Sequence, residues 1–420
     1  MKNKYQKGEK MKAAKFVCVI CGAEYELQEV YRCKKDNGEL SIVYDYEGIG
    51  KSDEFLSHWQ RAGSLWDRFR AILPQSDLSK IVSLGEGSTP LIKADRLAEK
   101  LGLKNVYLKL ELCNPTGSFK DRQMTVAVSK ANEWGKKDFG TVSSGNVGIA
   151  LSAYCAKKGF NANVWVADNV SPTKMQQIQI YGAKLFLFPN AEEHGVEFYK
   201  IFFNSMQEFC FKEGLVPMIS ARPINPYMVE GSKTISFEIV SELGHVPERV
   251  FTPIGGGGLY SGLWKGFKEL QMMHIIDHLP VIDGVQATGD HESIKTLKDT
   301  GINRVNMFQP LDGIWANESL EESGGNYYEV KSVEDNEAQK LLASSEGVFA
   351  EPIGTRAIVG LVKAAKSGKL ANVNEIVCVI TGNGLKDMSA AASILTDSKL
   401  YPGVDKIKTF SECVVKLKKS

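Results

Sequence analysis

The 420-residue chain lacks the features that would assign it to several special classes of protein. Its 51 lysines and arginines nearly balance its 50 aspartates and glutamates, for a formal charge of +1. It therefore has no excess of positive charge to attract nucleic acid or an anionic membrane. No apolar run approaches the roughly 20 residues of a membrane span, and the N-terminal MKNKYQKGEK lacks the apolar stretch of a secretory signal. We expect a soluble, cytoplasmic protein whose partner is a small molecule.

Internal repeats and low-complexity tracts are also absent, and the eight cysteines form no regular framework. Four of them stand in apolar or element-forming contexts: Cys113, Cys155, Cys210 and Cys378. This distribution favours a reducing compartment over a disulfide-linked scaffold. The length exceeds the roughly 100–200 residues of one ordinary domain, which predicts two or three domains with a large core.

What the sequence does contain, from about residue 80 onward, is an alternation of apolar strand-like runs with helical segments. The runs are NVYLKLEL (105–112), NVWVAD (163–168), KLFLFP (184–189), RVFTPI (249–254) and EIVCVITG (375–382). This alternation predicts parallel sheets covered by helices. Glycine-rich turns follow several runs, at the carboxyl ends of strands where open α/β sheets bind their ligands.

The first of these turns holds a lysine between a strand and a helix. Residues 114–122 (NPTGSFKDR) follow the apolar run at 105–112 and lead into the helical segment at 125–134. A lysine in this position can be desolvated, and a lowered pKa makes its free amine available for a Schiff base. Taken alone, a lysine in a turn is more often a solvated surface charge.

Two further turns offer groups that bind anions. Residues 141–146 (TVSSGN) place hydroxyls, a glycine and an amide at a helix N-terminus, which suits a carboxylate but also a simple N-cap. Residues 255–258 are four consecutive glycines. They suit a phosphate because they expose backbone N–H groups and allow close approach. They do not spell GxGxxG, so a dinucleotide site is disfavoured, and a flexible turn without a ligand is the alternative.

A fourth turn, residues 381–387 (TGNGLKD), follows the last apolar run of the chain. The hydroxyl of Thr381 could bond to a ring nitrogen of a cofactor. Each turn is ambiguous by itself. Together, four such turns at strand ends can converge on one cofactor.

In their order along the chain, NPTGSFKDR, SSGN, GGGGL and TGNGLKD resemble the motifs of fold-type II pyridoxal-phosphate (PLP) enzymes of the tryptophan-synthase-β type, in particular the threonine synthase family. Supporting pieces are WDRFR (66–70), LGEGSTPL (84–91) and EGVFAEP (346–352), so the resemblance covers nearly the whole chain. It implies an α/β fold with two twisted, mainly parallel sheets flanked by helices, and PLP as the cofactor.

The same resemblance implies a domain layout. Residues 1–48 would be a tail and a small ribbon module resembling a zinc ribbon. Residues 49–122 and 236–420 would form the large PLP-binding domain, and residues 123–235 the small domain. Dimers are usual in this family, so we expect a homodimer.

The resemblance also implies roles for individual residues. Lys120 would carry PLP as a Schiff base and remove the α-proton of the substrate as general base. Phe119 would neighbour the ring, and Asn146 would bond to its phenolic oxygen. Thr381 would face the pyridine nitrogen, where a neutral hydroxyl tempers the electron sink. The cofactor phosphate would lie on Gly255, Gly256, Gly257, Gly258 and Leu259. The substrate would contact Ser143, Ser144, Gly145, Arg122 and Arg356.

The chain departs from threonine synthases at two places. They usually continue SSGN with Thr-Ala, whereas Val147 and Gly148 follow here, so a substrate-binding hydroxyl is lost. They usually read Glu-Pro-Ala-Ser-Ala where residues 351–356 read EPIGTR. Arg356 is either a solvated helix residue or an oxyanion ligand, since its planar fork matches phosphate-like and sulfite-like groups.

These departures favour a relative of threonine synthase, cysteate synthase. That enzyme replaces the phosphate of O-phospho-L-serine with sulfite and gives L-cysteate for coenzyme M biosynthesis. The alternative is threonine synthase itself, which converts O-phospho-L-homoserine and water to L-threonine and phosphate. The expected partners are thus an amino-acid phosphate and sulfite.

The N-terminal Cys18, Cys21 and Cys33 resemble the start of a zinc ribbon, which needs four ligands. Asp36 stands in the fourth place. A Cys₃Asp site is uncommon, and a ribbon that has lost its metal would read the same way, so the sequence favours no bound metal. A zinc-dependent nucleic-acid binder could be built on this module alone, but the neutral charge and the four turns argue against that class.

Overall fold

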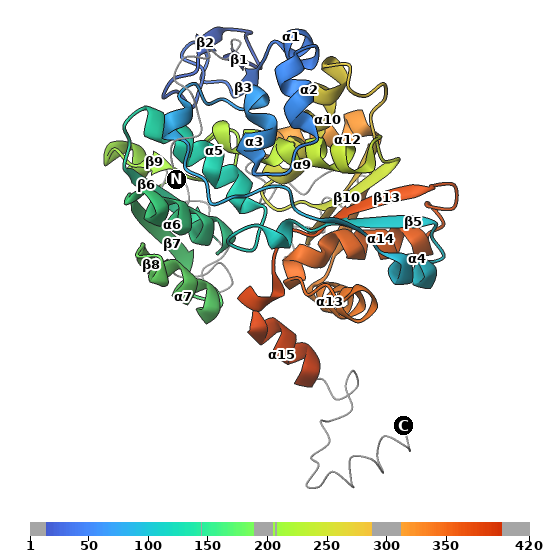
Figure 1. Ribbon diagram of the computed structural model, residues 1–420. Coiled ribbons are helices and arrows are strands. Elements are labelled where there is room, and N and C mark those ends of the chain that lie inside the picture. Colours follow the sequence, from blue (N-terminus) through green and yellow to red (C-terminus); the bar gives the residue numbers. More distant parts are fainter. Residues whose placement is uncertain (1–13, 144, 189–204, 206–207, 288–311, 397–420) are drawn as a thin grey trace.

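The computed structural model describes residues 14–143, 145–188, 205, 208–287 and 312–396, which form three sheets and their covering helices (Figure 1). The predicted α/β class, with mainly parallel sheets flanked by helices, is confirmed. Within this part of the chain, no helix is both long enough and apolar enough to cross a bilayer.

A small antiparallel sheet near the N-terminus is the predicted ribbon module. Its strand order is β2-β1-β3, and each outer strand pairs antiparallel with β1. Phe16, Leu40 and Ile42 point into the core, which seats the sheet on the rest of the protein. The strands are β1 (Lys15–Cys18), β2 (Glu24–Glu26) and β3 (Leu40–Val43). The short helices α1 (Tyr46–Gly50), α2 (Asp53–Trp59) and α3 (Leu65–Phe69) follow.

The largest sheet has six strands in the order β12-β11-β10-β13-β5-β4, and only β4 runs antiparallel to its neighbour. Its central strands read as continuous apolar runs because helices cover both faces (Figure 1). The strands are β4 (Leu91–Lys93), β5 (Asn105–Lys109), β10 (Arg249–Pro253), β11 (Val281–Ala287), β12 (Tyr327–Val330) and β13 (Glu375–Val379). The helices are α4 (Asp95–Leu101), α10 (Gly258–Met272), α12 (Gly313–Ser323), α13 (Ser332–Glu346) and α14 (Arg356–Lys366).

A third sheet of four parallel strands has the order β8-β7-β6-β9. Its strands are β6 (Asp138–Ser143), β7 (Asn161–Ala167), β8 (Lys184–Phe188) and β9 (Val216–Pro217). The associated helices are α5 (Lys120–Glu133), α6 (Asn146–Lys158), α7 (Pro172–Ile180) and α9 (Tyr227–Leu243). A last helix, α15 (Met388–Thr396), extends away from the body (Figure 1).

The predicted strand runs all contain strands, but the observed strands end one to three residues earlier. The last residues of the runs at 105–112, 249–254 and 375–382 lead into turns that carry the candidate site. The predicted limits of the small domain, at residues 122 and 235, fall within α5 and α9. The division into domains therefore stays a prediction.

Helices α5, α9 and α10 pack closely because glycines stand at their crossings. A Cβ atom at Gly231 would lie 1.9 Å from the backbone oxygen of Arg122, and one at Gly266 would lie 2.4 Å from that of Lys233. Backbone atoms cannot yield to such an overlap. Gly231 thus lets α9 approach the start of α5, where Lys120 stands, and Gly266 lets α10 approach α9.

A buried ion network joins β5, α5 and α9. Arg122 is fully buried and lies 2.7 Å from carboxylate oxygens of both Glu111 and Glu238. Lys109, also fully buried, lies 2.8 Å from Glu238 Oε2, an oxygen that Arg122 also contacts. The two cations hold the pKa of Glu238 below its ordinary value despite the opposing effect of burial.

We predict that Glu238→Ala destabilises the protein by about 3–5 kcal/mol, because the substitution leaves two buried cations without a shared carboxylate. Urea denaturation followed by circular dichroism measures the change. The matched control is Glu337→Ala on α13, an exposed glutamate, which should change the free energy of unfolding by less than about 0.5 kcal/mol. Equal losses in the two variants would contradict the role of the network.

Candidate active site

Lys120 is the first residue of α5 and is partly buried. Its Nζ lies 2.7 Å from Ser220 Oγ and 3.4 Å from Gln123 Oε1. The ring centroid of Phe119 is 4.3 Å away. Burial lowers the pKa of Lys120 to about 7, so the neutral amine is well populated at neutral pH. A neutral amine is what a reaction with an aldehyde requires.

Ser220 connects this lysine with the glycine turn before α10. A Cβ atom at Gly256 or Gly258 would lie 3.6 or 3.3 Å from the backbone oxygen of Ser220. Gly257 has φ +93°, and a Cβ there would lie 2.8 Å from the backbone oxygen of Asp312. Only glycine suits this position, and the turn presents its N–H groups at the N-terminus of a 15-residue helix. Leu259, the second residue of α10, is buried.

A buried pair of opposite charges stands behind the glycine turn. The backbone N–H of Asp312 donates to Gly256 O at 2.9 Å, and its carboxylate accepts a hydrogen bond from Ser261 at 2.9 Å. Arg222 is also buried and reaches the same Ser261 hydroxyl at 3.5 Å. Burial raises the pKa of Asp312 to about 6 and lowers that of Arg222. The arginine thus offers a positive charge on this side of the turn.

The turn after β13 lies against the turn that carries Lys120. The backbone N–H of Phe119 donates to Thr381 O at 3.2 Å, and that of Asn383 donates to Gly117 O at 2.9 Å. Thr381 is buried. The backbone N–H of Glu351 donates to Gly382 O at 2.9 Å on the other side. The TGNGLKD turn (381–387) therefore lies between the turn that carries Lys120 and the EGVFAEP segment (346–352).

Asn146 begins α6 and meets the same EGVFAEP segment. Its Nδ2 donates to Glu351 Oε1, and the Lys174 amine forms an ion pair with Glu351 Oε2 at 2.9 Å. Asn146 Oδ1 is buried and has no hydrogen-bond partner among the described residues. Gly382 leaves room for this carboxylate, since a Cβ there would lie 2.0 Å from Glu351 Oε1.

Part of the SSGN motif has a structural role. The Ser143 hydroxyl accepts hydrogen bonds from the backbone N–H groups of Gly145 at 3.0 Å and Gly148 at 3.2 Å, so it caps α6. Gly145 has φ +125°, and a Cβ there would lie 2.6 Å from the Lys174 side chain. Ser144, also expected to contact the substrate, lies outside the described residues. Of the two roles expected for this motif, the structure shows helix capping by Ser143, and its contact with a substrate stays a prediction.

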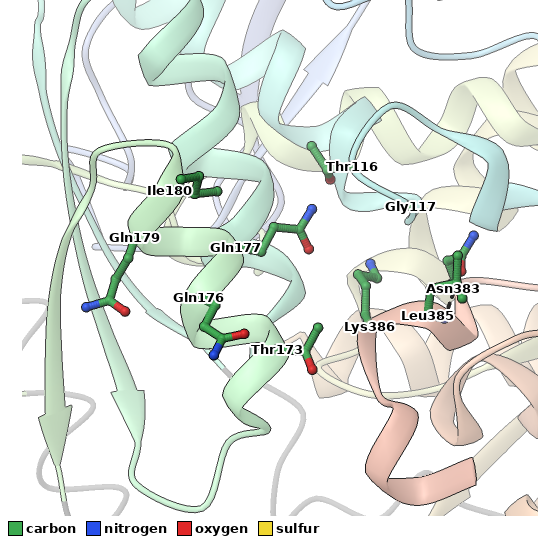
Figure 2. A pocket seen from close by; sticks show the side chains of 10 residues that line it. All are labelled: Thr116, Gly117, Thr173, Gln176, Gln177, Gln179, Ile180, Asn383, Leu385 and Lys386. Atoms are coloured by element: carbon green, nitrogen blue, oxygen red, sulfur yellow. Dashed lines mark hydrogen bonds between the residues drawn. The ribbon is translucent and has the colours of Figure 1, made fainter. Parts of the chain in front are cut away.

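A cavity of about 790 Å³ lies between α7 and the turn after β13 (Figure 2). Thr173 and Gln177 of α7 form one side, and Lys386 faces them from the other, in the short helix Gly384–Lys386. Thr116 and Gly117, in the turn before Lys120, complete the wall. The cavity therefore adjoins the candidate site.

Lys386 is a residue of this wall to which the sequence analysis gave no role. It is buried, and its Nζ has no hydrogen-bond partner in the described part of the chain. Burial lowers its pKa to about 8, so it is still largely protonated at neutral pH. Its position inside the TGNGLKD motif was a usable signal. Ser220 and Lys174 stand in no motif, and only the structure reveals them.

The structure corrects the expected role of Arg122. Its Nε donates to Glu111 at 2.7 Å, and its two terminal nitrogens are bound by Glu111, Glu238, Thr234 and Thr89. The side chain is fully buried, so no donor remains for a substrate. The sequence could not show this because its partners lie far away along the chain.

Arg356 is the first residue of α14, and its Nε donates to Asp335 of α13 at 3.2 Å. The expected fixed cation thus already has a carboxylate partner. Burial raises the pKa of Asp335, with Arg356 opposing the shift. A contact between Arg356 and a substrate stays a prediction.

The described residues fit a phosphorylated aldehyde cofactor. The neutral amine of Lys120 is well populated near neutral pH, the glycine turn exposes N–H groups for a phosphate, and Asn146 keeps a buried amide oxygen with no hydrogen-bond partner among the described residues. Three strand-end turns, after β5, β6 and β10, supply these groups from two sheets. This arrangement defines a cofactor-dependent α/β enzyme.

The chain belongs to the pyridoxal-phosphate dependent enzyme family, whose model matches residues 82–382. It is 38% identical to threonine synthase of Methanocaldococcus jannaschii over 390 residues, covering 89% of this chain and 93% of that protein. It is 36% identical to threonine synthase of Methanosarcina acetivorans over 385 residues, covering 88% and 91%. The cofactor is pyridoxal phosphate.

Solved structures support the fold. Maize serine racemase superposes with a TM-score of 0.56 at 19% identity, covering 73% of this chain and 91% of that one. O-ureido-L-serine synthase superposes with a TM-score of 0.56 at 21% identity, covering 78% and 96%. At these identities the likeness concerns the fold alone.

We predict that PLP attaches covalently to the apoenzyme at a rate that rises with pH and reaches half its maximum near pH 7. Attachment needs the unprotonated amine, and burial lowers the pKa of Lys120 to about 7, against about 10.4 for an ordinary lysine. The absorbance of bound cofactor follows the rate, and Nα-acetyl-lysine corrects for titration of PLP itself. Lys120→Ala should show no attachment. A pyridoxyl group found on another lysine after borohydride reduction would sink the assignment.

Proposed function

We propose that the protein removes the phosphate of an O-phosphorylated amino acid, with the threonine synthase reaction as the leading candidate: O-phospho-L-homoserine and water to L-threonine and phosphate. Similarity to two threonine synthases over nearly the whole chain is the observation that carries this proposal. The candidate site supports it, because an unpartnered buried cation faces the adjoining cavity.

Pyridoxal phosphate, when bound, supplies an electron sink for negative charge beside the amino-acid α-carbon. Lys120 holds the cofactor and, with its lowered pKa, accepts the α-proton at neutral pH. Ser220 and Gln123 orient its Nζ through hydrogen bonds. Thr381 is proposed to face the pyridine nitrogen with a neutral hydroxyl, so the ring gains no full positive charge from this side chain.

Other residues are proposed to position the cofactor and to exclude water. One N–H of the Asn146 amide is used by Glu351, and the amide is proposed to face the phenolic oxygen of the cofactor. The cofactor phosphate is assigned to the turn formed by Gly255, Gly256, Gly257, Gly258 and Leu259. The N–H groups at the N-terminus of α10 favour an anion at this turn.

The leaving phosphate of the substrate is assigned to the cavity between α7 and the turn after β13. Lys386 offers a largely protonated amine with no hydrogen-bond partner in the described part of the chain. Thr116 lies on the same wall, but its hydroxyl and its backbone N–H already donate to Asp121. A buried cation is costly without an anion. The nearby Glu351 only partly compensates, since it is shared with Lys174 and Asn146.

We predict that Lys386→Met raises the KM for the phosphorylated substrate about ten- to hundredfold, the equivalent of a charge-assisted hydrogen bond of about 1.5–3 kcal/mol. Steady-state kinetics with varied substrate measure the change. Absorbance of the bound cofactor should stay as in the wild type. The matched control is Lys369→Met, an exposed lysine bonded to Asn326. If KM is unchanged, the phosphate lies elsewhere.

The second candidate is the cysteate synthase reaction, in which sulfite replaces the phosphate of O-phospho-L-serine. Two residues favour it: Val147 stands where threonine synthases usually carry a hydroxyl, and Arg356 adds a cation. The ion pair of Arg356 with Asp335 weakens this support, because part of the charge is already compensated. The expected homodimer stays a prediction for either reaction.

We predict that the wild-type protein converts O-phospho-L-homoserine to L-threonine without any need for sulfite. Each of the two phosphorylated substrates is incubated with and without sulfite, which gives four reactions. Amino-acid analysis of their products distinguishes the two candidate functions. Cysteate formed from O-phospho-L-serine and sulfite would make the second candidate the function. Phosphate released from neither substrate would refute both.

If cysteate forms, Arg356→Ala tests the sulfite site. Loss of a charge-assisted contact should raise the sulfite requirement about ten- to hundredfold. Lys363→Ala is the matched control, since Lys363 lies on the same helix and pairs with Glu334, the neighbour of Asp335. Equal effects of the two variants would assign Arg356 a structural role.

A further inference from the structure

The ribbon module contains two turns with the same backbone geometry. In the first, the N–H of Gly22 donates to Cys18 O at 2.9 Å and the N–H of Cys18 donates to Ala23 O at 2.9 Å. Gly22 has φ +69°, directly after Cys21. The thiols of Cys18 and Cys21 thus project from one tight turn.

The second turn repeats this pattern with an aspartate in place of the second cysteine. The N–H of Asn37 donates to Cys33 O at 3.0 Å, and the N–H of Cys33 donates to Gly38 O at 2.9 Å. Asn37 has φ +57°, directly after Asp36. Cys33 and Asp36 therefore occupy the places that Cys18 and Cys21 occupy in the first turn.

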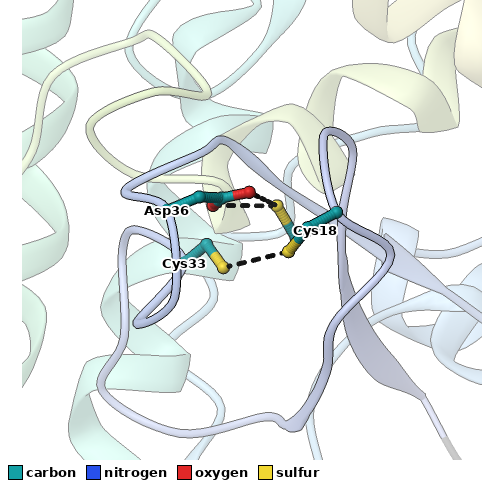
Figure 3. Close-up of side chains that lie close together, drawn as sticks. Cys18, Cys33 and Asp36 are labelled. Atoms are coloured by element: carbon teal, nitrogen blue, oxygen red, sulfur yellow. Dashed lines mark hydrogen bonds between the residues drawn. The ribbon is translucent and has the colours of Figure 1, made fainter.

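The two turns bring their four side chains together. Figure 3 shows Cys18, Cys33 and Asp36 of this group. One potential ligand atom from each of Cys18, Cys21, Cys33 and Asp36 lies within 4.8 Å of the others. Between the turns, Cys21 Sγ lies 3.7 Å from Cys33 Sγ, and Cys18 Sγ lies 3.4 Å from Asp36 Oδ1. Tetrahedral zinc, with Zn–S about 2.3 Å and Zn–O about 2.0 Å, needs S···S edges of about 3.8 Å and S···O edges of about 3.5 Å.

The surroundings suit deprotonated ligands. The Tyr25 hydroxyl lies 3.1 Å from Cys33 Sγ, and the backbone N–H of Lys35 donates to the same sulfur at 3.4 Å. The backbone N–H of Gly38 donates to Asp36 Oδ1 at 2.8 Å. A Cβ at Gly38 would lie 2.8 Å from both Asp36 Oδ1 and Cys18 Sγ, so glycine keeps the space open. Such hydrogen bonds orient metal ligands from outside.

We propose that Cys18, Cys21, Cys33 and Asp36 bind a zinc ion in a closed structural site. Three thiolates favour zinc over magnesium or calcium, and four protein ligands leave no open position for catalysis. A disulfide between Cys21 and Cys33 would need the sulfurs to approach to about 2.05 Å and would leave the placement of Asp36 without a reason. The geometry thus replaces the sequence-based expectation of a ribbon without metal.

The site stabilises a module that contacts the wall of the candidate active site. Glu39, just after the second turn, accepts a hydrogen bond from Trp315 Nε1. The guanidinium of Arg222 lies 3.6 Å from the centre of the Trp315 ring and reaches Ser261 behind the glycine turn. Loss of the metal should therefore lower the thermal stability of the whole protein.

The test is metal analysis of the purified holoenzyme, with cobalt as a spectroscopic probe. We expect about one zinc per chain, and tetrahedral cobalt–thiolate absorption after exchange. Asp36→Ala should lose most of the metal, whereas Asp36→Cys should retain it and shift the cobalt spectrum towards four thiolates. Glu26→Ala, an exposed acid of the same sheet, and Cys113→Ser are the matched controls and should keep the metal.

Three results would overturn the proposal. They are wild-type protein without zinc in which Cys18, Cys21 and Cys33 react with a thiol reagent, a Cys21–Cys33 disulfide in the purified protein, or Asp36→Ala with zinc content and cobalt spectrum unchanged. Each result is read without an activity assay. Failure of the zinc site is therefore distinguishable from failure of the proposed reaction.

Discussion

The buried guanidinium of Arg122 is the constraint on which the active site depends. It stands two residues after Lys120 and binds carboxylates from the segment after β5 and from α9. A buried charge must be compensated within the protein, so the first turn of α5 is held against both elements. Gly231 permits the close approach that this requires. The amine of Lys120 is thereby fixed at a partly buried position, and burial in turn lowers its pKa.

Backbone hydrogen bonds join the other turns of the candidate site to the turn that carries Lys120. The turn at Thr381 binds the lysine turn on one side and Glu351 on the other. Asn146 reaches that same carboxylate from the four-stranded sheet. The site thus forms where strand ends of two sheets face each other, as expected for α/β proteins. Lys386 owes its place in the cavity wall to this turn, and its amine, which has no hydrogen-bond partner in the described part of the chain, suits the cavity for an anion.

Much of this arrangement could be predicted from the sequence. The apolar runs located β5, β7, β8, β10 and β13, which are five of the ten strands in the two larger sheets. Lys120 lies between a strand and a helix as expected, but the helix begins at Lys120 itself and not at residue 125. The contacts of the charged residues were harder to predict from the sequence. Arg122 was expected at the substrate but lies in the core, and Arg356 has a carboxylate partner on a neighbouring helix. Ser220 and Lys174 carried no recognisable pattern at all.

The sequence by itself determined the order of strands, turns and helices, because these follow from local periodicity and from glycines that tolerate unusual backbone angles. It also placed Lys120 in a turn between a strand and a helix, the position from which the candidate site is built. Only the tertiary structure decided which charges are compensated. Arg122 and Glu238 are 116 positions apart, and Asn146 and Glu351 are 205 apart. Contacts at such separations depend on how the sheets pack, and no local pattern in the chain encodes them.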